Sequence, residues 1–211
     1  MKKILFILLV SGSILRMFPQ KSVTKIIDFN GDFIRINLGK IDHLELIQSS
    51  KNKVNIVANE LQQESSFLKI ENQKNELFID AVQTEILKDE RPACIEQPLF
   101  TSYKISVPKN VKVFITIKSG NFFTSNYNGF LDLQVQEGEI NLKNILGNIK
   151  IINIDGIIFC TTAIKNIIAI SHLGNVYLQK EKPVKNNKSI RELLKIETIR
   201  GNIFVNTNKT P

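Results

Sequence analysis

The chain has few of the residues on which several protein classes depend. Its 211 residues contain no tryptophan, two cysteines and two histidines. Two cysteines cannot form a disulfide scaffold or a multi-cysteine zinc site. The histidines, His43 and His172, do not fall in a metal-ligand spacing. We therefore expect no metal site and no cofactor.

The sequence also lacks the motifs of common enzymes and of nucleic-acid-binding domains. It has no Gly-x-Ser-x-Gly motif, no phosphate-binding loop and no dinucleotide fingerprint. Its net charge of +8 is not organised as an aromatic and basic motif on a predicted sheet. We expect a protein that is not an enzyme, has no catalytic residues and binds no nucleic acid.

Residues 1–20 have the pattern of an export signal. Lys2 and Lys3 precede an apolar run from Ile4 to Val10, which has the length of a signal core and is short for a membrane anchor. A buried first strand and an uncleaved anchor are the alternatives. We expect cleavage near Gln20, an exported protein of the periplasm, outer envelope or medium, and no integral membrane segment after cleavage. Removing these residues lowers the formal charge to +5.

Seven of the ten glycines are spaced with unusual regularity. Gly120 begins a series with a spacing of nine residues, and the position that would extend it beyond Gly156 is Lys165. The flanking residues repeat better at 18 than at nine. A longer gap before the last glycine predicts an inserted loop around residues 180–189. The series consists of Gly120, Gly129, Gly138, Gly147, Gly156, Gly174 and Gly201.

Aliphatic residues recur two and four positions after these glycines. Because alternate residues of a strand share one face, the columns predict inward faces of short strands that each start at a glycine turn. An 18-residue period with two strands and two turns favours a single-stranded β-helix, in which stacked rungs bury a continuous core. An antiparallel β-sandwich is the alternative. The first column is Phe122, Ile140, Ile158, Val176 and Ile203.

The first half of the chain predicts less regular strands. Residues 83–100 contain two prolines and few strand-forming residues, which indicates a long excursion. With no sharp boundary, we expect one domain over 21–211, irregular over 21–117 and with regular rungs over 118–206. The expected early strands are Thr24–Phe29, Phe33–Leu38, His43–Gln48, Val54–Val57, Phe67–Glu71, Leu77–Val82, Tyr103–Val107 and Val111–Ile117.

These features together resemble a known family. The strand Phe33-Ile34-Arg35-Ile36 and the segment from Ile105 to Val113 lead into tandem Ser-Gly and Asp-Gly turns. Over residues 23–206 the chain resembles the putative auto-transporter adhesin head domain (head GIN domain) and related adhesins of bacterial envelopes. The resemblance implies a right-handed β-helix and a role in adhesion, and it transfers no functional residue to this chain.

Two groups of residues could carry chemistry. Cys160 falls in an inward column, which predicts a buried and inert thiol. A disulfide with Cys94 in an oxidising compartment is the alternative, which the inward direction of Cys160 disfavours. Glu137 and Asp155 both precede a glycine, one rung apart, so a glycan-active enzyme with paired carboxylates is an alternative function. Acids before glycine are also ordinary turn formers, and we favour that reading.

One outward column predicts a binding surface. Three residues after the glycines of the first series, four of five positions are aromatic, and a loop or the first half of the chain is the alternative cover for these rings. We expect an exported, adhesin-like or scaffolding protein that binds a glycan or an envelope protein through this sheet face. A self-assembling envelope module that forms homo-oligomers is a further alternative. The expected contact residues are Phe123, Phe159, Tyr177 and Phe204.

Overall fold

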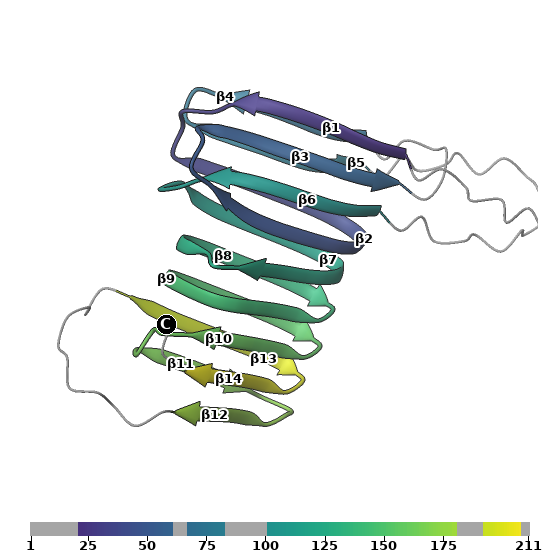
Figure 1. Ribbon diagram of the computed structural model, residues 1–211. Coiled ribbons are helices and arrows are strands. Elements are labelled where there is room, and N and C mark those ends of the chain that lie inside the picture. The colour runs from purple at the N-terminus through teal and green to yellow at the C-terminus, as the bar shows by residue number, and fades with distance from the viewer. Residues whose placement is uncertain (1–20, 61–66, 83–100, 181–191, 208–211) are drawn as a thin grey trace, which may run out of the picture.

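The protein is all-β in a computed structural model, which describes residues 21–60, 67–82, 101–180 and 192–207. Within these ranges there is no helix, and the strands join into one 14-stranded sheet (Figure 1). The expected signal segment, the excursion at 83–100 with Cys94, and most of the loop at 180–189 lie outside the described residues. No helix in the described part is long and apolar enough to cross a membrane.

The early strands agree with the sequence prediction, except that two expected strands form one continuous strand, β2. The strands are β1 (Lys21–Asp28), β2 (Phe33–Ser49), β3 (Lys53–Glu60), β4 (Phe67–Gln73), β5 (Glu76–Val82), β6 (Thr101–Pro108), β7 (Lys112–Ser125), β8 (Asn128–Glu137), β9 (Ile140–Asp155), β10 (Ile158–Thr162), β11 (Ile167–Ser171), β12 (Val176–Lys180), β13 (Leu193–Arg200) and β14 (Ile203–Thr207).

The strands are ordered in two ladders. The first ladder runs β1-β3-β6-β2-β7-β9-β10-β14-β12. The second runs β4-β5-β2-β7-β8-β9-β13-β11, and the long strands β2, β7 and β9 take part in both. The pairings among β7 to β14 are parallel, whereas β1, β3 and β4 pair in antiparallel fashion. Each ladder therefore has one end at the early strands and one at β11 or β12.

The register follows the glycine spacing in β7 to β10. Phe122 is paired with Ile140, and Ile140 with Ile158, so that successive partners are separated by one full period of the sequence repeat. The turn glycines adopt the predicted positive φ at Gly120, Gly138, Gly147, Gly156 and Gly201. At these turns a side chain would be strained and would also meet the backbone of the adjacent strand or turn.

The order of the last strands differs from the expected succession along the chain. β13 lies between β9 and β11, and β14 lies between β10 and β12. Ile203 is therefore paired with both Ile158 and Val176. The chain places β11 and β12 at the outer end, and β13 and β14 return to fill the space inside them (Figure 1).

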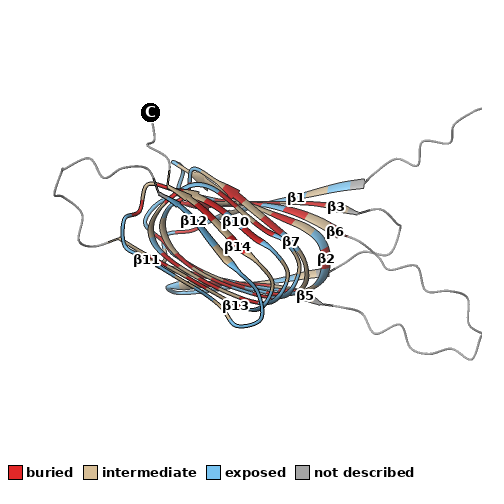
Figure 2. Ribbon diagram, turned by 90° about the horizontal axis from the view of Figure 1, so that it is seen from below, coloured by how far each residue is buried: buried red, intermediate tan, exposed pale blue. Residues whose placement is uncertain are grey.

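The core lies between the two ladders. Most inward positions are aliphatic and buried. The view turned by 90° shows strands on two sides of the molecule with this core between them (Figure 2). Burial of one such aliphatic side chain contributes about 1.5–3 kcal/mol. The predicted columns are confirmed as inward at Phe122, Ile140, Ile158 and Ile203, which are all buried. Val176 is only partly buried because it lies on the terminal strand β12.

Candidate binding face

The four aromatic residues expected to bind a partner lie in one register column of the first ladder. Starting from β7, the column runs Phe123, Asn141, Phe159, Phe204 and Tyr177, each paired with the next across neighbouring strands. We call these five residues the aromatic column. Phe204 comes before Tyr177 in the column although it follows Tyr177 in the sequence, because β14 lies between β10 and β12.

Three rings of the aromatic column form a continuous stack. Phe159 and Phe204 have ring centroids 5.2 Å apart with 14° between their planes, and Tyr177 and Phe204 are 4.7 Å apart at 6°. These separations are close to the spacing of neighbouring strands, so each ring lies directly over the next. Both faces of Phe204 are covered by rings, whereas the outer face of Tyr177 is not stacked on a described ring.

The stack is accessible from outside. Phe159 is 38% exposed and Tyr177 is 49% exposed, while Phe204 between them is half-buried. The described part of the first half of the chain, which is one of the alternative covers, therefore does not bury these two side chains. The rings turn their edges outward and their faces toward one another, which makes the stack a rigid apolar ridge on the sheet.

Phe123 is separated from the stack by Asn141 and has a different environment. Its ring lies 6.4 Å from the imidazole of His43, with 28° between their planes, and the Lys143 ammonium lies 5.4 Å from its centroid. Phe123 is half-buried. The sequence predicted its outward direction but missed His43 and Lys143, because neither lies in the glycine register that revealed the aromatic column.

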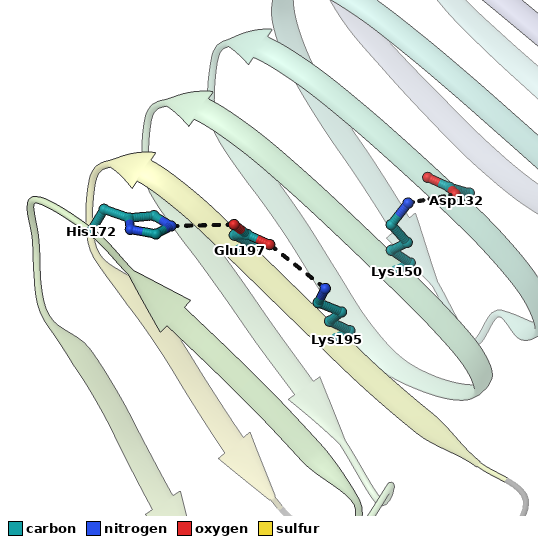
Figure 3. A network of polar contacts seen from close by, with 5 residues as sticks. All are labelled: Asp132, Lys150, His172, Lys195 and Glu197. Atoms are coloured by element: carbon teal, nitrogen blue, oxygen red, sulfur yellow. Dashed lines mark hydrogen bonds and ion pairs between the residues drawn. The ribbon is translucent and has the colours of Figure 1, made fainter.

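The corresponding column of the second ladder is mainly charged, although it also contains Phe114, whose ring is tilted against that of Phe130 at 5.4 Å. Lys150 pairs with Asp132 at 3.2 Å, and Glu197 accepts contacts from His172 at 3.2 Å and from Lys195 at 3.7 Å (Figure 3). The hydrogen bond from His172 lowers the pKa of the Glu197 carboxyl. The two outer surfaces thus differ in chemistry: the near-parallel stack of three rings lies on the first ladder, whereas the rings of Phe114 and Phe130 on the second are tilted against each other.

The carboxylates considered for catalysis are in register but have ordinary partners. Glu137 and Asp155 are cross-strand partners, as their spacing predicted, and both are exposed. Asp155 Oδ2 lies 3.9 Å from Nε of Arg200, its partner on the other side. A shallow polar depression of about 90 Å³, bordered by residues including Asn37 and Gln134, lies elsewhere on the sheet.

Cys160 is buried in the core as predicted and carries a free thiol. Burial raises the pKa of this thiol to about 12, so that it stays protonated at neutral pH. Within the described ranges no three His, Cys, Asp or Glu side chains are grouped so that they could hold a metal ion.

Comparison with solved structures identifies the fold. A putative cell adhesion protein from Clostridium sporogenes superposes with a TM-score of 0.62 at 15% identity, covering 90% of this chain and 100% of that chain. This chain shares the fold of that protein. A putative adhesin from Bacteroides fragilis gives a TM-score of 0.37 at 14% identity, covering 88% of this chain and 97% of that one.

The sequence comparisons do not assign the chain to a family. No family model matches the chain, and no curated protein matches it. Membership of the adhesin head domain family, expected from the sequence, therefore stays a prediction, while the structural similarity to the Clostridium protein establishes the fold alone.

Proposed function

We propose that this chain is an exported envelope protein that binds a surface partner through the aromatic column, in the manner of an adhesin or scaffold. The observation that carries the proposal is the exposed stack of Phe159, Phe204 and Tyr177. Stacked rings form a large apolar surface that loses little conformational entropy on binding, because each ring already holds its neighbour in place.

The scaffold under this surface is a single-stranded right-handed β-helix in our proposal. Parallel partners that repeat at the period of the glycine series in β7 to β10 support this architecture over an antiparallel sandwich. In such a scaffold the positions of outward side chains are fixed by the backbone register at about 4.8 Å intervals. This gives a partner-binding surface the rigidity that a loop does not have.

The geometry of the stack favours an extended protein partner over a sugar ring. Sugars bind aromatic side chains by lying flat on a ring face, but both faces of Phe204 and one face each of Phe159 and Tyr177 are occupied by rings of the stack. The ridge of ring edges suits aliphatic or aromatic side chains of an envelope protein. A glycan remains the second ligand class, to be separated by experiment.

The proposal includes binding without catalysis. The candidate acids Glu137 and Asp155 are exposed at turns, and Asp155 is ion-paired with Arg200. This arrangement suits turn formation better than a paired acid and nucleophile, which need an enclosed site next to the substrate. The resemblance to adhesins and the name of the Clostridium structure add support for a surface role.

The test compares two double variants of the exported chain. Phe159→Ser/Tyr177→Ser removes the exposed rings, and Ile154→Ser/Ile199→Ser removes exposed apolar side chains outside the aromatic column. Both are assayed on a glycan array and in pull-downs from envelope extracts. We expect binding to fall at least about tenfold for the ring variant alone, which corresponds to about 1.4 kcal/mol. Equal binding by both variants would rule out the aromatic column as the contact surface.

A further inference from the structure

The two ends of the ladders are protected differently. At one end the outermost strands are β1 and β4, and at the other they are β12 and β11 (Figure 1). Such outermost strands present backbone N–H and C=O groups that can pair with another strand. Proteins commonly block these edges with charged side chains, especially inward-pointing ones.

The end at β1 and β4 is blocked by a lysine. Lys25 is paired with the buried Ile56 and therefore lies in an inward column, where an aliphatic residue would be expected. Its ammonium donates a hydrogen bond across the end of the sheet to the carbonyl oxygen of Leu68 on β4, at 3.5 Å. Addition of a further strand there would bury this charge, which is costly. The ion pair between Lys53 and Asp28 adds charge at the same end.

The end at β11 and β12 has no such protection among the described residues. β11 contains no charged residue, and β12 has one, Lys180, at its last position. Leu178 is in register with the buried Val205, so it belongs to an inward column, yet it is 44% exposed. Its exposure arises because no described strand follows β12 in the ladder.

Several exposed residues of this end are apolar, beside the exposed polar residues His172 and Gln179. Ile168 and Ile170 on β11 are exposed, as is Leu173 in the following turn. Tyr177 ends the aromatic stack with an open ring face. An edge that carries a charge only at its last position, is largely apolar and pairs with no further described strand is the type of surface that associates by strand pairing.

We propose that this end docks against the same end of a second copy, giving a closed two-fold dimer. A two-fold axis perpendicular to the strands sets β12 antiparallel to its counterpart and β11 antiparallel to its counterpart at the same time. Antiparallel pairing about Leu178 places Lys180 opposite Val176 of the other copy rather than opposite its own lysine. No like charges then meet at the centre of either new strand pair.

The difference between the ends limits the assembly to two copies. An open fibre requires the end at β12 to dock on the end at β1, which is a head-to-tail contact. Lys25 blocks that contact because its charge would be buried without a carboxylate partner. The end at β11 and β12 is fully occupied by the second copy in the dimer, so no further copy can bind there. The inference concerns the strand edge at β11 and β12, which shares Tyr177 with the aromatic column, and it does not rest on the proposed function.

The experiment measures the mass of the protein by sedimentation velocity over a wide range of concentration. The full chain is expressed in a host that exports it and is purified as the host processes it. We expect a reversible monomer–dimer equilibrium that levels off at two copies. Leu178→Lys should weaken the dimer at least about tenfold, because it buries a charge at the centre of the new strand pair.

A matched variant at the other end provides the control. Ile26→Lys adds the same charge at a residue that is 65% exposed on β1, and it should leave the dimer unchanged. Circular dichroism melts establish that both variants fold. A wild-type protein that stays monomeric, fibres that lengthen with concentration, or equal loss of the dimer in both variants would each overturn the proposal. Partner binding by a monomeric Leu178→Lys variant would separate this inference from the proposed function.

Discussion

The rings of Tyr177 and Phe204 stack at a centroid distance of 4.7 Å although the two residues lie far apart in the sequence. The contact exists because the chain builds the outermost strands β11 and β12 first and then returns to place β13 and β14 inside them. The last two strands therefore contact neighbours on both sides, and each outer strand depends on one of them for its only ladder partner among the described strands.

A pair of engineered cysteines tests this strand order. Asp155 and Arg200 are register partners on β9 and β13, at about the 4.8 Å spacing of adjacent strands, which is within disulfide reach. We expect Asp155→Cys/Arg200→Cys, in a Cys94→Ser background, to cross-link on mild oxidation. The product is detected as a shift in mobility on non-reducing gels.

The matched control places the second cysteine where a sequential order would bring it. Asp155 precedes Gly156 and Leu173 precedes Gly174, so the two would be neighbours if the rungs followed one another along the chain. In the structure β13 lies between β9, which ends at Asp155, and β11, which leads into the turn with Leu173. Two strand spacings, about 9.6 Å, exceed the span of a disulfide. Asp155→Cys/Leu173→Cys should therefore stay reduced. Cross-linking of this pair in preference to the first would show that the strands follow one another in chain order.

The strands and inward columns could be predicted from the sequence because alternation and glycine turns are local signals. Gly120 and Gly138, for example, precede buried residues at fixed offsets. The order of the last strands could not be predicted in this way. Gly201 lies a multiple of nine residues from both Gly156 and Gly174, so the same columns match in either order. The two orders are distinguished only by the pairing of β14 along both of its edges, with β10 on one side and β12 on the other.

A double-mutant cycle measures the energy of the ring stack. Tyr177→Ser, Phe204→Ser and the double variant are unfolded in urea, and the free energies of unfolding are compared. Aromatic pairs of this geometry contribute about 0.5–1.5 kcal/mol beyond their burial, so we expect a coupling energy in that range. A parallel cycle on Phe123 and Phe204, whose strands are not adjacent, should give a coupling near zero. Coupling of equal size in both cycles would contradict direct stacking.

The candidate site was only partly accessible to sequence reasoning. The outward direction of Phe159 and Tyr177 followed from alternation, and the structure agrees. The stacking of their rings about Phe204 did not follow, because it depends on the strand order. The sequence also did not predict the inward position of Lys25, because an isolated lysine in a strand is usually assigned to the outer face. Its inward position arises from the antiparallel register of β1 on β3.

Two glycine substitutions test the backbone requirement at the turns. Gly201 has φ of 140°, and a Cβ there would meet the carbonyl of Gly156 on the neighbouring turn. Gly201→Ala should lower the free energy of unfolding by about 1–3 kcal/mol or more, through strain and displacement of that turn. Gly129 has no positive φ, and its Cβ would find ordinary contacts at 3.6 Å. Gly129→Ala should be neutral or stabilise by up to about 1 kcal/mol. Equal losses in urea unfolding would contradict this account.

Alkaline pH should destabilise the fold through two buried acids. Burial raises the pKa of the Cys160 thiol from 9.0 to about 12, and it also raises the pKa of the Tyr127 hydroxyl, which donates a hydrogen bond to the Phe130 carbonyl at 2.9 Å. Above the unfolded-state pKa the unfolded chain loses these protons while the folded protein keeps them. The stability present below about pH 9 is therefore lost progressively as pH rises toward 12.

The Cys160→Ala variant isolates the contribution of the thiol to this pH dependence. Replacing Cys160 removes one of the two titrating groups, so the free energy of unfolding should fall less steeply between pH 9 and about 12 than in the wild type. The difference in free energy of unfolding between the two proteins at pH 7 reports the small cavity left by the substitution. The change of that difference with pH reports the ionisation of the thiol. Urea titrations at several pH values supply both quantities.

In the native wild type a thiol reagent should label Cys160 slowly, and labelling should accelerate in urea. Rapid native labelling, or identical pH slopes for the two proteins, would show that the thiol is not held neutral in the core.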